Sequence, residues 1–242
     1  MATAARRLRI QPLETRLLMA TDLDDDGTLK IEGTDQRDIV VIEEAGRNIV
    51  VTFNGDTERF RASEVENIEV DLKGGNDRLT VRDIGRRAEI DDISVETDEG
   101  NDQVTFTNVT VEEDIEIETG DGRDRVTLTN VRADRIDVDT GDGRDDVTFT
   151  NVRADEVEID TGDDDDQVVI TRSRFSGGVS VDLESGDDSL EITRSVFEDE
   201  AFFDGGDDFD ELILARNQFE DDFEDEDFEV GGTDEDDEDD ED

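Results

Sequence analysis

The chain has 242 residues, a formal net charge of -52 and only 32% hydrophobic residues. Without further pattern this composition predicts disorder, because too little apolar surface is available to offset the entropy lost on ordering. So acidic a surface also excludes nucleic acid as a partner, and the absence of cysteine, histidine and any eighteen-residue apolar run excludes disulfides, much acid–base chemistry and a transmembrane segment.

Residues 1–20 are basic, in contrast to the rest of the chain. They contain Arg6, Arg7, Arg9 and Arg16, which predicts a targeting or attachment segment outside the fold. The apolar stretch 17–20 is too short for an ordinary secretory signal peptide. The alternative is an amphipathic N-terminal helix without a special role.

The stretch 13–20, Leu-Glu-Thr-Arg-Leu-Leu-Met-Ala, resembles the LEPR-XLL motif near the N-termini of planctomycete surface and exported proteins. Thr15 stands where that motif has proline. The resemblance implies export or association with the cell surface, and therefore an extracellular or cell-surface location.

From residue 21 to 216 one aspartate returns about every 21 or 22 residues, within the same apolar frame. An aliphatic residue follows it by two positions, an apolar residue precedes it by seven, and a carboxylate stands six positions before it. A register held over most of the chain indicates a solenoid, in which one supersecondary unit is stacked repeatedly. We call these residues the turn aspartates: Asp38, Asp77, Asp102, Asp124, Asp145, Asp166, Asp188 and Asp210.

Each repeat contains two period-two pairs of apolar residues, one on either side of an acidic, glycine-containing turn. The prediction is an all-β, right-handed parallel β-helix with about seven to eight coils of 21–22 residues, paired at about 4.8 Å. Asn108, Asn130 and Asn151 recur at one corner, where stacked asparagines bond from coil to coil. We expect them to pack the structure rather than to bind a ligand.

The two ends depart from the repeat. The first coil, residues 29–67, is irregular and contains an apolar run at 49–53, which predicts an extra strand pair, either as a cap or as part of an irregular coil. At the other end, residues 217–242 predict a cap formed by Phe219, Phe223 and Phe228, followed by an acidic tail that is disordered from Asp234 onward.

In the predicted solenoid the acidic residues of one turn lie next to those of the neighbouring turns. Two carboxylates about 5 Å apart repel by roughly 1 kcal/mol in water, and by several kcal/mol at an effective dielectric near 20. Arg123, Arg125 and Arg144 offset only a few of these charges. A divalent cation between the turns would compensate the rest, and Ca²⁺ tolerates irregular oxygen coordination better than Mg²⁺.

The segment 119–127, Thr-Gly-Asp-Gly-Arg-Asp-Arg-Val-Thr, and its copy at 140–148 resemble the G-G-x-G-x-D-x-U-x nonapeptide of hemolysin-type (RTX) calcium-binding proteins. They lack the first glycine, and the chain has one acidic turn per coil where those proteins have two. The resemblance implies metal ligands among the turn aspartates and turn glycines. With the neighbouring acids, the candidate set is Asp77, Asp102, Asp121, Asp124, Asp142, Asp145, Asp163, Asp166, Asp188, Asp210, Gly120, Gly122, Gly141 and Gly143.

The favoured function is therefore a non-enzymatic, calcium-binding solenoid with a structural or adhesive role, with cell-surface or matrix polymers as further partners. One alternative is a β-helical polysaccharide lyase or hydrolase. The chain has so many acids without a catalytic role that a catalytic carboxylate pair cannot be told apart from them. The other is a halophilic protein whose acids hold hydrated salt without specific calcium sites.

Overall fold

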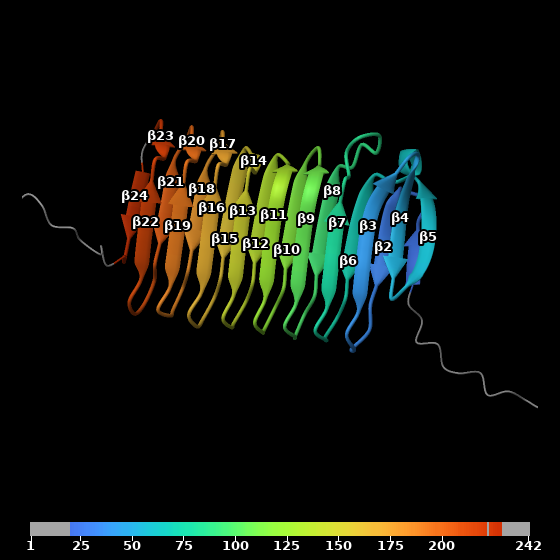
Figure 1. Ribbon diagram of the computed structural model, residues 1–242, viewed down its shortest axis with the longest axis horizontal. Helices are drawn as coiled ribbons and strands as arrows, with labels where there is room; N and C mark the ends of the chain where they lie inside the picture. The colour runs from blue at the N-terminus through green and yellow to red at the C-terminus, as the bar shows by residue number, and fades with distance from the viewer. Residues whose placement is uncertain (1–19, 222, 229–242) are drawn as a thin grey trace, which may run out of the picture.

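The computed structural model describes residues 20–221 and 223–228, which form a parallel β-solenoid of about seven turns (Figure 1). These residues are strands and loops apart from one short 3₁₀ turn, Ala62–Glu64. The alternation of apolar and polar residues explains this, because every second side chain of a strand points to the same face. In this part of the chain no helix is long and apolar enough to cross a membrane.

One wall of the solenoid is a ten-stranded sheet, parallel except for the first pair β1–β2. In spatial order its strands are β1 (Ala20–Leu23), β2 (Thr28–Glu32), β6 (Asn67–Asp71), β8 (Asp92–Glu96), β10 (Asp114–Glu118), β12 (Arg135–Asp139), β15 (Glu156–Asp160), β18 (Val179–Asp182), β21 (Ala201–Asp204) and β24 (Phe223–Glu226).

The facing wall belongs to a fourteen-stranded sheet. Its main path is β22 (Glu211–Ala215), β19 (Ser189–Thr193), β16 (Gln167–Thr171), β13 (Asp146–Thr150), β11 (Arg125–Arg132), β9 (Gln103–Thr110), β7 (Arg78–Arg82), β3 (Ile39–Ala45), β4 (Asn48–Phe53) and β5 (Asp56–Arg61). A short strip continues from β11 through β14 (Arg153–Ala154), β17 (Arg174–Phe175), β20 (Val196–Phe197) and β23 (Gln218–Phe219).

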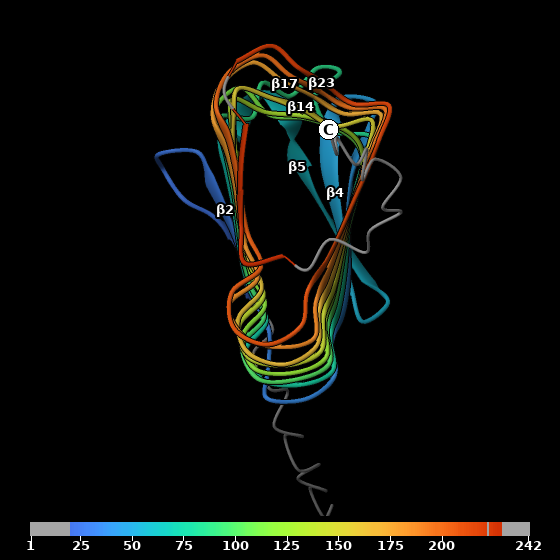
Figure 2. The same cartoon turned by 90° about the vertical axis from the view of Figure 1, so that its left-hand side faces the viewer.

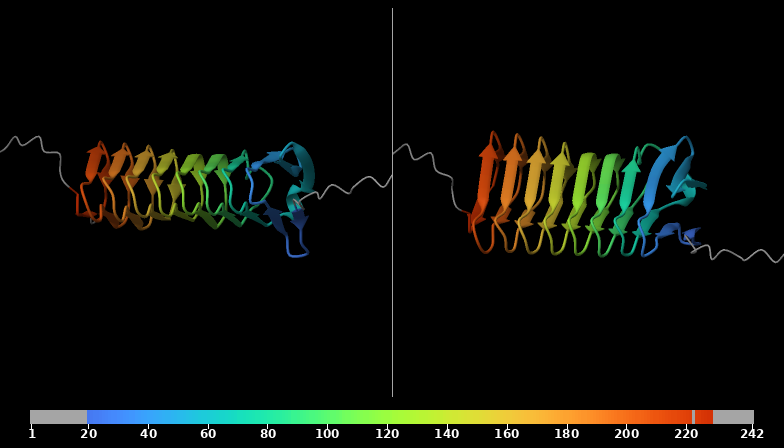
Figure 3. Two further views of the ribbon diagram at one scale, coloured as in Figure 1. Left: turned by 90° about the horizontal axis from the view of Figure 1, so that it is seen from below. Right: turned by 60° about the horizontal axis from the view of Figure 1, so that its bottom comes forward.

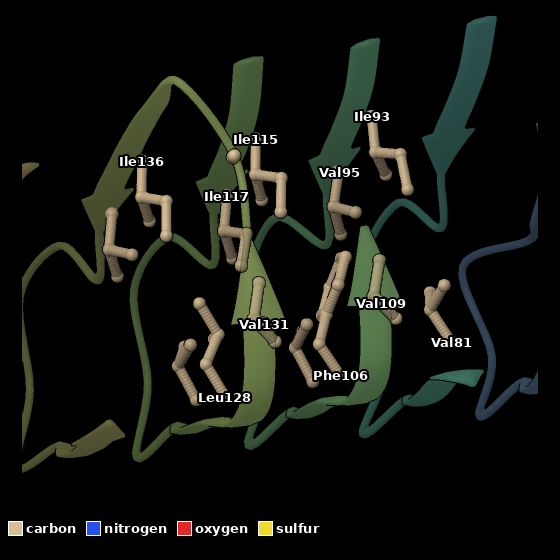
Figure 4. Close-up of a cluster of buried hydrophobic side chains, with 14 of the residues drawn as sticks. Val81, Ile93, Val95, Phe106, Val109, Ile115, Ile117, Leu128, Val131 and Ile136 are labelled. Carbon is tan, nitrogen blue, oxygen red and sulfur yellow. The ribbon is translucent and has the colours of Figure 1, made fainter. Parts of the chain in front are cut away.

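The core lies between the walls and repeats from coil to coil (Figure 4). Ile117 of β10 is in register with Val95 of β8 and Val138 of β12, and all three are at most 1% exposed. Phe106 and Leu128 face them from the other wall (Figure 4). Burial of each such side chain contributes roughly 1.5–3 kcal/mol to the stability of the fold. The β-branched residues among them pack well on the pleated surface of a sheet.

The two ends are built differently. At the N-terminal end the antiparallel strands β4 and β5 continue from β3, and in the end-on view they lie across the far end of the tube (Figure 2). Ile49 and Val51 of β4 are buried in the core. The predicted extra strand pair is therefore confirmed, as a cap.

At the C-terminal end the phenylalanines stack. The ring centroids of Phe197 and Phe219 lie 4.8 Å apart, and those of Phe219 and Phe223 lie 4.5 Å apart. Phe228 also packs against the core. Strands β23 and β24 continue the coil to residue 226, beyond the predicted solenoid boundary at 216. The predicted disordered tail from Asp234, and the LEPR-XLL-like stretch apart from Ala20, lie outside the described residues.

Candidate functional site: the stacked acidic turns

The acidic turns join the two walls and form the row of loops along the bottom of Figure 1, seen from below and tilted forward in Figure 3. Each turn carries a turn aspartate directly before a strand of the fourteen-stranded sheet. All eight turn aspartates are buried, with exposed fractions between 0% and 4%. Their side chains therefore lie inside the solenoid rather than on its acidic surface.

The turn aspartates form a hydrogen-bonded ladder. Oδ1 of Asp124 accepts a bond from the peptide N–H of Asp102 at 2.6 Å, and the peptide N–H of Asp124 donates to Oδ1 of Asp145 at 2.6 Å. The same bond links every consecutive pair from Asp38 to Asp210, at 2.6–2.8 Å. From Asp77 onward each carboxyl group thus satisfies a buried peptide group of the preceding coil.

The second carboxyl oxygen has a different environment. Oδ2 is buried without a hydrogen-bond partner in six turn aspartates: Asp77, Asp102, Asp124, Asp145, Asp166 and Asp188. An unpartnered buried polar atom costs about 1–3 kcal/mol, and more if it is charged. Six such atoms in one row therefore make this the most unusual polar feature of the described residues.

A threonine hydroxyl lies beside several of these carboxyl groups. Thr119 interacts with Asp124, and Thr140 with Asp145. The hydroxyl of Thr119 donates to the carbonyl oxygen of Thr140 at 3.2 Å, so its hydrogen is already engaged. A neutral carboxyl group could donate to that hydroxyl oxygen, whereas a carboxylate would face it with lone pairs. The threonines were overlooked in the sequence, although the signal was visible five residues before the turn aspartates Asp102, Asp124, Asp145 and Asp166.

The pKa values agree with a ladder that resists ionisation. Burial is the largest cause and raises the pKa of Asp124 to about 7, while the peptide N–H of Asp102 lowers it and neighbouring carboxylates raise it. For the same leading reason the pKa is raised to about 6 at Asp145 and to about 8 at Asp166. It is raised to about 7 at Asp188. Near neutral pH these four carboxyl groups therefore hold more protons than exposed aspartates do.

The turn glycines make the close stacking possible. A Cβ atom on Gly122 would lie 1.5 Å from the carbonyl oxygen of Gly100, and one on Gly143 would lie 1.5 Å from that of Gly122. Where aspartate replaces this glycine, at Asp164 and Asp208, φ is positive, 88° and 87°. Two positions earlier in the turn, Gly120 and Gly141 also have positive φ, 77° and 71°.

The acids six residues before the turn aspartates cap the turns. Oδ1 of Asp139 accepts a bond from the peptide N–H of Gly141 at 3.0 Å, and Asp160 does the same for Gly162 at 3.2 Å. Burial, followed by repulsion from Asp139, raises the pKa of Asp160 to about 6. This second ladder runs in register through the ten-stranded sheet: Glu32, Asp71, Glu96, Glu118, Asp139, Asp160, Asp182, Asp204 and Glu226.

The remaining predicted ligands lie outside. Asp121, Asp142 and Asp163 are exposed at the turn surface, and Asp142 and Asp163 line a depression of about 580 Å³ with other acids. Arg144 pairs with Asp165 in the same region at 2.9 Å. Within the described residues no group of three or more carboxylates is arranged as a ready-made metal site. The structure thus separates the predicted ligand set into a buried ladder and an exposed acidic rim.

The opposite corner carries the asparagines. Nδ2 of Asn151 donates to Oδ1 of Asn130 at 2.8 Å, and Nδ2 of Asn130 donates to Oδ1 of Asn108 at 2.9 Å. Asn108 in turn donates to Asp83 at 3.3 Å. All four residues have φ of 55–56°, a conformation that asparagine and aspartate tolerate. The predicted packing role of the asparagines is confirmed.

In later coils arginine takes the asparagine position, and a serine one position further on forms a different ladder. The peptide N–H of Val152 donates to Oγ of Ser173 at 3.1 Å, and that of Ser173 donates to Oγ of Ser195 at 3.1 Å. Asn217 accepts the corresponding bond from Ser195 at 3.0 Å. Side-chain oxygens therefore satisfy the peptide groups of preceding coils at both corners.

Three arginines also follow the repeat. Arg132, Arg153 and Arg174 are in register on neighbouring strands and line a depression of about 420 Å³ with acids such as Asp134 and Asp155. They continue the coil pattern, whereas a polysaccharide-cleaving site is expected to interrupt it with a cleft. The arrangement balances charge along one edge.

The stacked turns, side-chain ladders and continuous core define a parallel β-solenoid repeat protein. The model of the Toastrack family (DUF4097) matches residues 8–218. The chain belongs to this family. No curated protein and no solved structure matches it.

The resemblance to hemolysin-type calcium-binding repeats was wrong, because the matching family is Toastrack. The short motif has a general physical origin in this fold. Glycine is needed where Gly122 approaches Gly100, aspartate supplies the acceptor for a peptide N–H at Asp124, and Val126 begins the buried strand pattern. The stacked turn thus favours similar residues at similar spacing, although aspartate replaces the glycine at Asp164 and Asp208.

Proposed function

We propose that this Toastrack solenoid is a non-enzymatic structural or adhesive protein, exported or located at the cell surface, that binds Ca²⁺ along its acidic turns. The supporting observation is the row of buried carboxyl oxygens without partners, such as Oδ2 of Asp124 and Asp145. Oxygen atoms from carboxylates and backbone carbonyls are the ligands that Ca²⁺ prefers.

The fit to calcium rests on charge and on donor type. The turn aspartates supply Oδ2, the turn peptides at Gly120 and Gly122 supply carbonyl oxygens, and Asp121 adds an exposed carboxylate at the rim. When bound, calcium would replace the proton on the carboxyl group and remove repulsion between neighbouring turns. Calcium and protons should therefore compete, so that the affinity for calcium rises with pH.

Thermal unfolding of the full chain tests this proposal. At pH 8 we expect a higher Tm in CaCl₂ than in KCl of equal ionic strength, with MgCl₂ giving a smaller rise. One site adds about 2.7 kcal/mol to the free energy of unfolding when free calcium is 100 times its Kd. Equal Tm values in CaCl₂ and KCl would refute specific calcium binding. They would favour a halophilic protein in which salt only screens the repulsion between carboxylates.

Two variants locate the effect. Asp124→Asn combined with Asp145→Asn should reduce the calcium-dependent rise in Tm and the number of sites seen by calorimetry. Glu113→Gln removes one charge from the exposed loop before β10, at the opposite end of the strand from the turn, and should leave the calcium response unchanged. Equal responses of all three chains would argue against ligands in the turns.

The surface role has separate support. Successive coils stack in register, so their outward side chains form continuous columns, which gives an extended periodic face suited to a repetitive cell-surface or matrix polymer. Cell fractionation with an antibody, followed by protease accessibility on intact cells, tests the location. A protein found only in the cytoplasmic fraction would contradict export.

A further inference from the structure

The C-terminal end of the fourteen-stranded sheet has an unpaired edge. Among the described residues β22 is the last strand there, whereas the other end of the sheet continues into the cap strands β4 and β5 (Figure 1). Leu212 and Leu214 continue the inward columns of Leu190 and Ile192, which are fully buried. Leu214, by contrast, is 38% exposed. The edge therefore offers both backbone pairing and apolar contact to another strand.

Further apolar side chains surround this edge. Ile213 of β22 is 39% exposed, and Phe209 in the turn before it is 58% exposed. Together with Leu214 they are three of the four large hydrophobic residues that are exposed in the described part of the chain. Edge strands are usually protected by charge or by cover, because they template pairing with other chains.

The ten-stranded sheet ends at this side in a strand that charged residues protect. In β24, Asp225 occupies the inward column directly after Phe203, and Glu224 and Glu226 flank it. An inward charge at the last rung disfavours the addition of a further strand. Of the two described wall strands that end the sheets here, β22 is thus the one open to strand addition, with the two-residue β23 beside it.

The charge at this end selects the partner. Residues 205–228 contain eleven acids and a single basic residue, Arg216. The same end of a second copy would be repelled, and so would any acidic strand. A strand that alternates basic and apolar residues would place its apolar side chains on the core and its cations among the acids.

One segment of this chain has that pattern. Arg7-Leu8-Arg9-Ile10 alternates basic and apolar residues, and residues 1–20 contain four arginines against one acid, Glu14. Pro12, which cannot donate to a ladder, stands two residues after the alternation ends. We propose that the segment 6–11 of one copy adds as a strand to the open edge of β22 in another copy.

The distance favours pairing between copies. From β2 to β21, in the coil of β22, the stack rises by seven steps of about 4.8 Å, and a strand added beyond β22 lies one step further, about 38 Å in all. The ten residues from Ile10 to Ala20 span at most about 33–36 Å when fully extended, which leaves no length to pass around the end. Between copies the same segment needs to bridge only the gap from one solenoid to the next. Such head-to-tail contacts are heterologous, so each copy can bind a further copy at its other end.

Sedimentation velocity on the full chain tests this inference. We expect oligomers that grow with concentration and weaken as salt screens the arginines. Leu8→Asp with Ile10→Asp should remove the donor segment, and Leu214→Asp should remove the acceptor edge, so each variant alone should be monomeric. Ile39→Asp changes an exposed hydrophobic residue of β3 away from this end and should assemble like the wild type.

Mixing the two defective chains gives the decisive measurement. The Leu8→Asp/Ile10→Asp chain keeps an intact edge and the Leu214→Asp chain keeps an intact segment, so an equimolar mixture should form a dimer and nothing larger. A peptide of residues 5–12 should bind the Leu8→Asp/Ile10→Asp chain more tightly than a peptide of the same composition in which the alternation is scrambled. A wild type that stays monomeric up to about 1 mM, or a mixture without dimers, would overturn the inference.

Discussion

Replacing Asp124 by asparagine should stabilise the protein at pH 8. The carboxamide oxygen can accept the bond from the peptide N–H of Asp102, as Oδ1 does now at 2.6 Å. Its NH₂ group can donate towards the hydroxyl of Thr119, where the carboxyl group presents Oδ2 without a partner. Asparagine thus mimics the protonated acid and cannot ionise.

The magnitude follows from the pKa. Burial raises the pKa of Asp124 from 3.8 to about 7. Between these values the folded chain keeps a proton that the unfolded chain has lost, so stability falls as pH rises and the loss levels off above pH 7. At 1.36 kcal/mol per pKa unit, the wild type loses roughly 4 kcal/mol at this site by pH 8. Asparagine avoids that loss, so we expect a gain of about 2–4 kcal/mol at pH 8 and almost none at pH 4.

Urea unfolding followed by circular dichroism at several pH values, in chelator, measures this difference. Asp121→Asn is the matched control, because it removes one charge from the exposed surface of the same turn and should shift stability by less than about 1 kcal/mol. If Asp124→Asn behaves like the control, or destabilises the chain equally at pH 4 and pH 8, the reasoning about a protonated ladder is wrong. The carbon chemical shift of the Asp124 carboxyl group would report the proton directly.

Three further substitutions test the stacking. Gly122→Ala should lower the free energy of unfolding by more than about 3 kcal/mol, because its Cβ would collide with the carbonyl oxygen of Gly100. The control is Gly178→Ala, which has open space around it and should change the free energy of unfolding by less than about 1 kcal/mol. Chemical denaturation measures both. Asn130→Ala should cost about 1–3 kcal/mol through lost ladder bonds and a strained φ; Asn130→Gly relieves the strain alone, so equal losses would show that φ is unimportant. Phe197→Ala should cost about 3–5 kcal/mol by emptying the stack, and an unchanged Tm would contradict its packing role.

The cap at the N-terminal end and the strands at the C-terminal end mark where sequence reasoning reached its limit. The run at 49–53 indicated an extra strand pair but left open whether it capped the core, because a local pattern does not say which surface a strand covers. The short strands β14, β17, β20 and β23 were not predicted, since two residues are too few to establish a period.

By itself the sequence determined the repeat, the all-β solenoid and the register of its core, because a period of 21 or 22 residues with alternating apolar positions leaves few other ways to bury them. Only the tertiary structure decided what the turn aspartates do. The spacing placed Asp124 in an acidic turn, yet whether its side chain faced solvent depended on the stacking of neighbouring coils. That stacking buries it, directs Oδ1 to the peptide N–H of Asp102 and leaves Oδ2 without a partner.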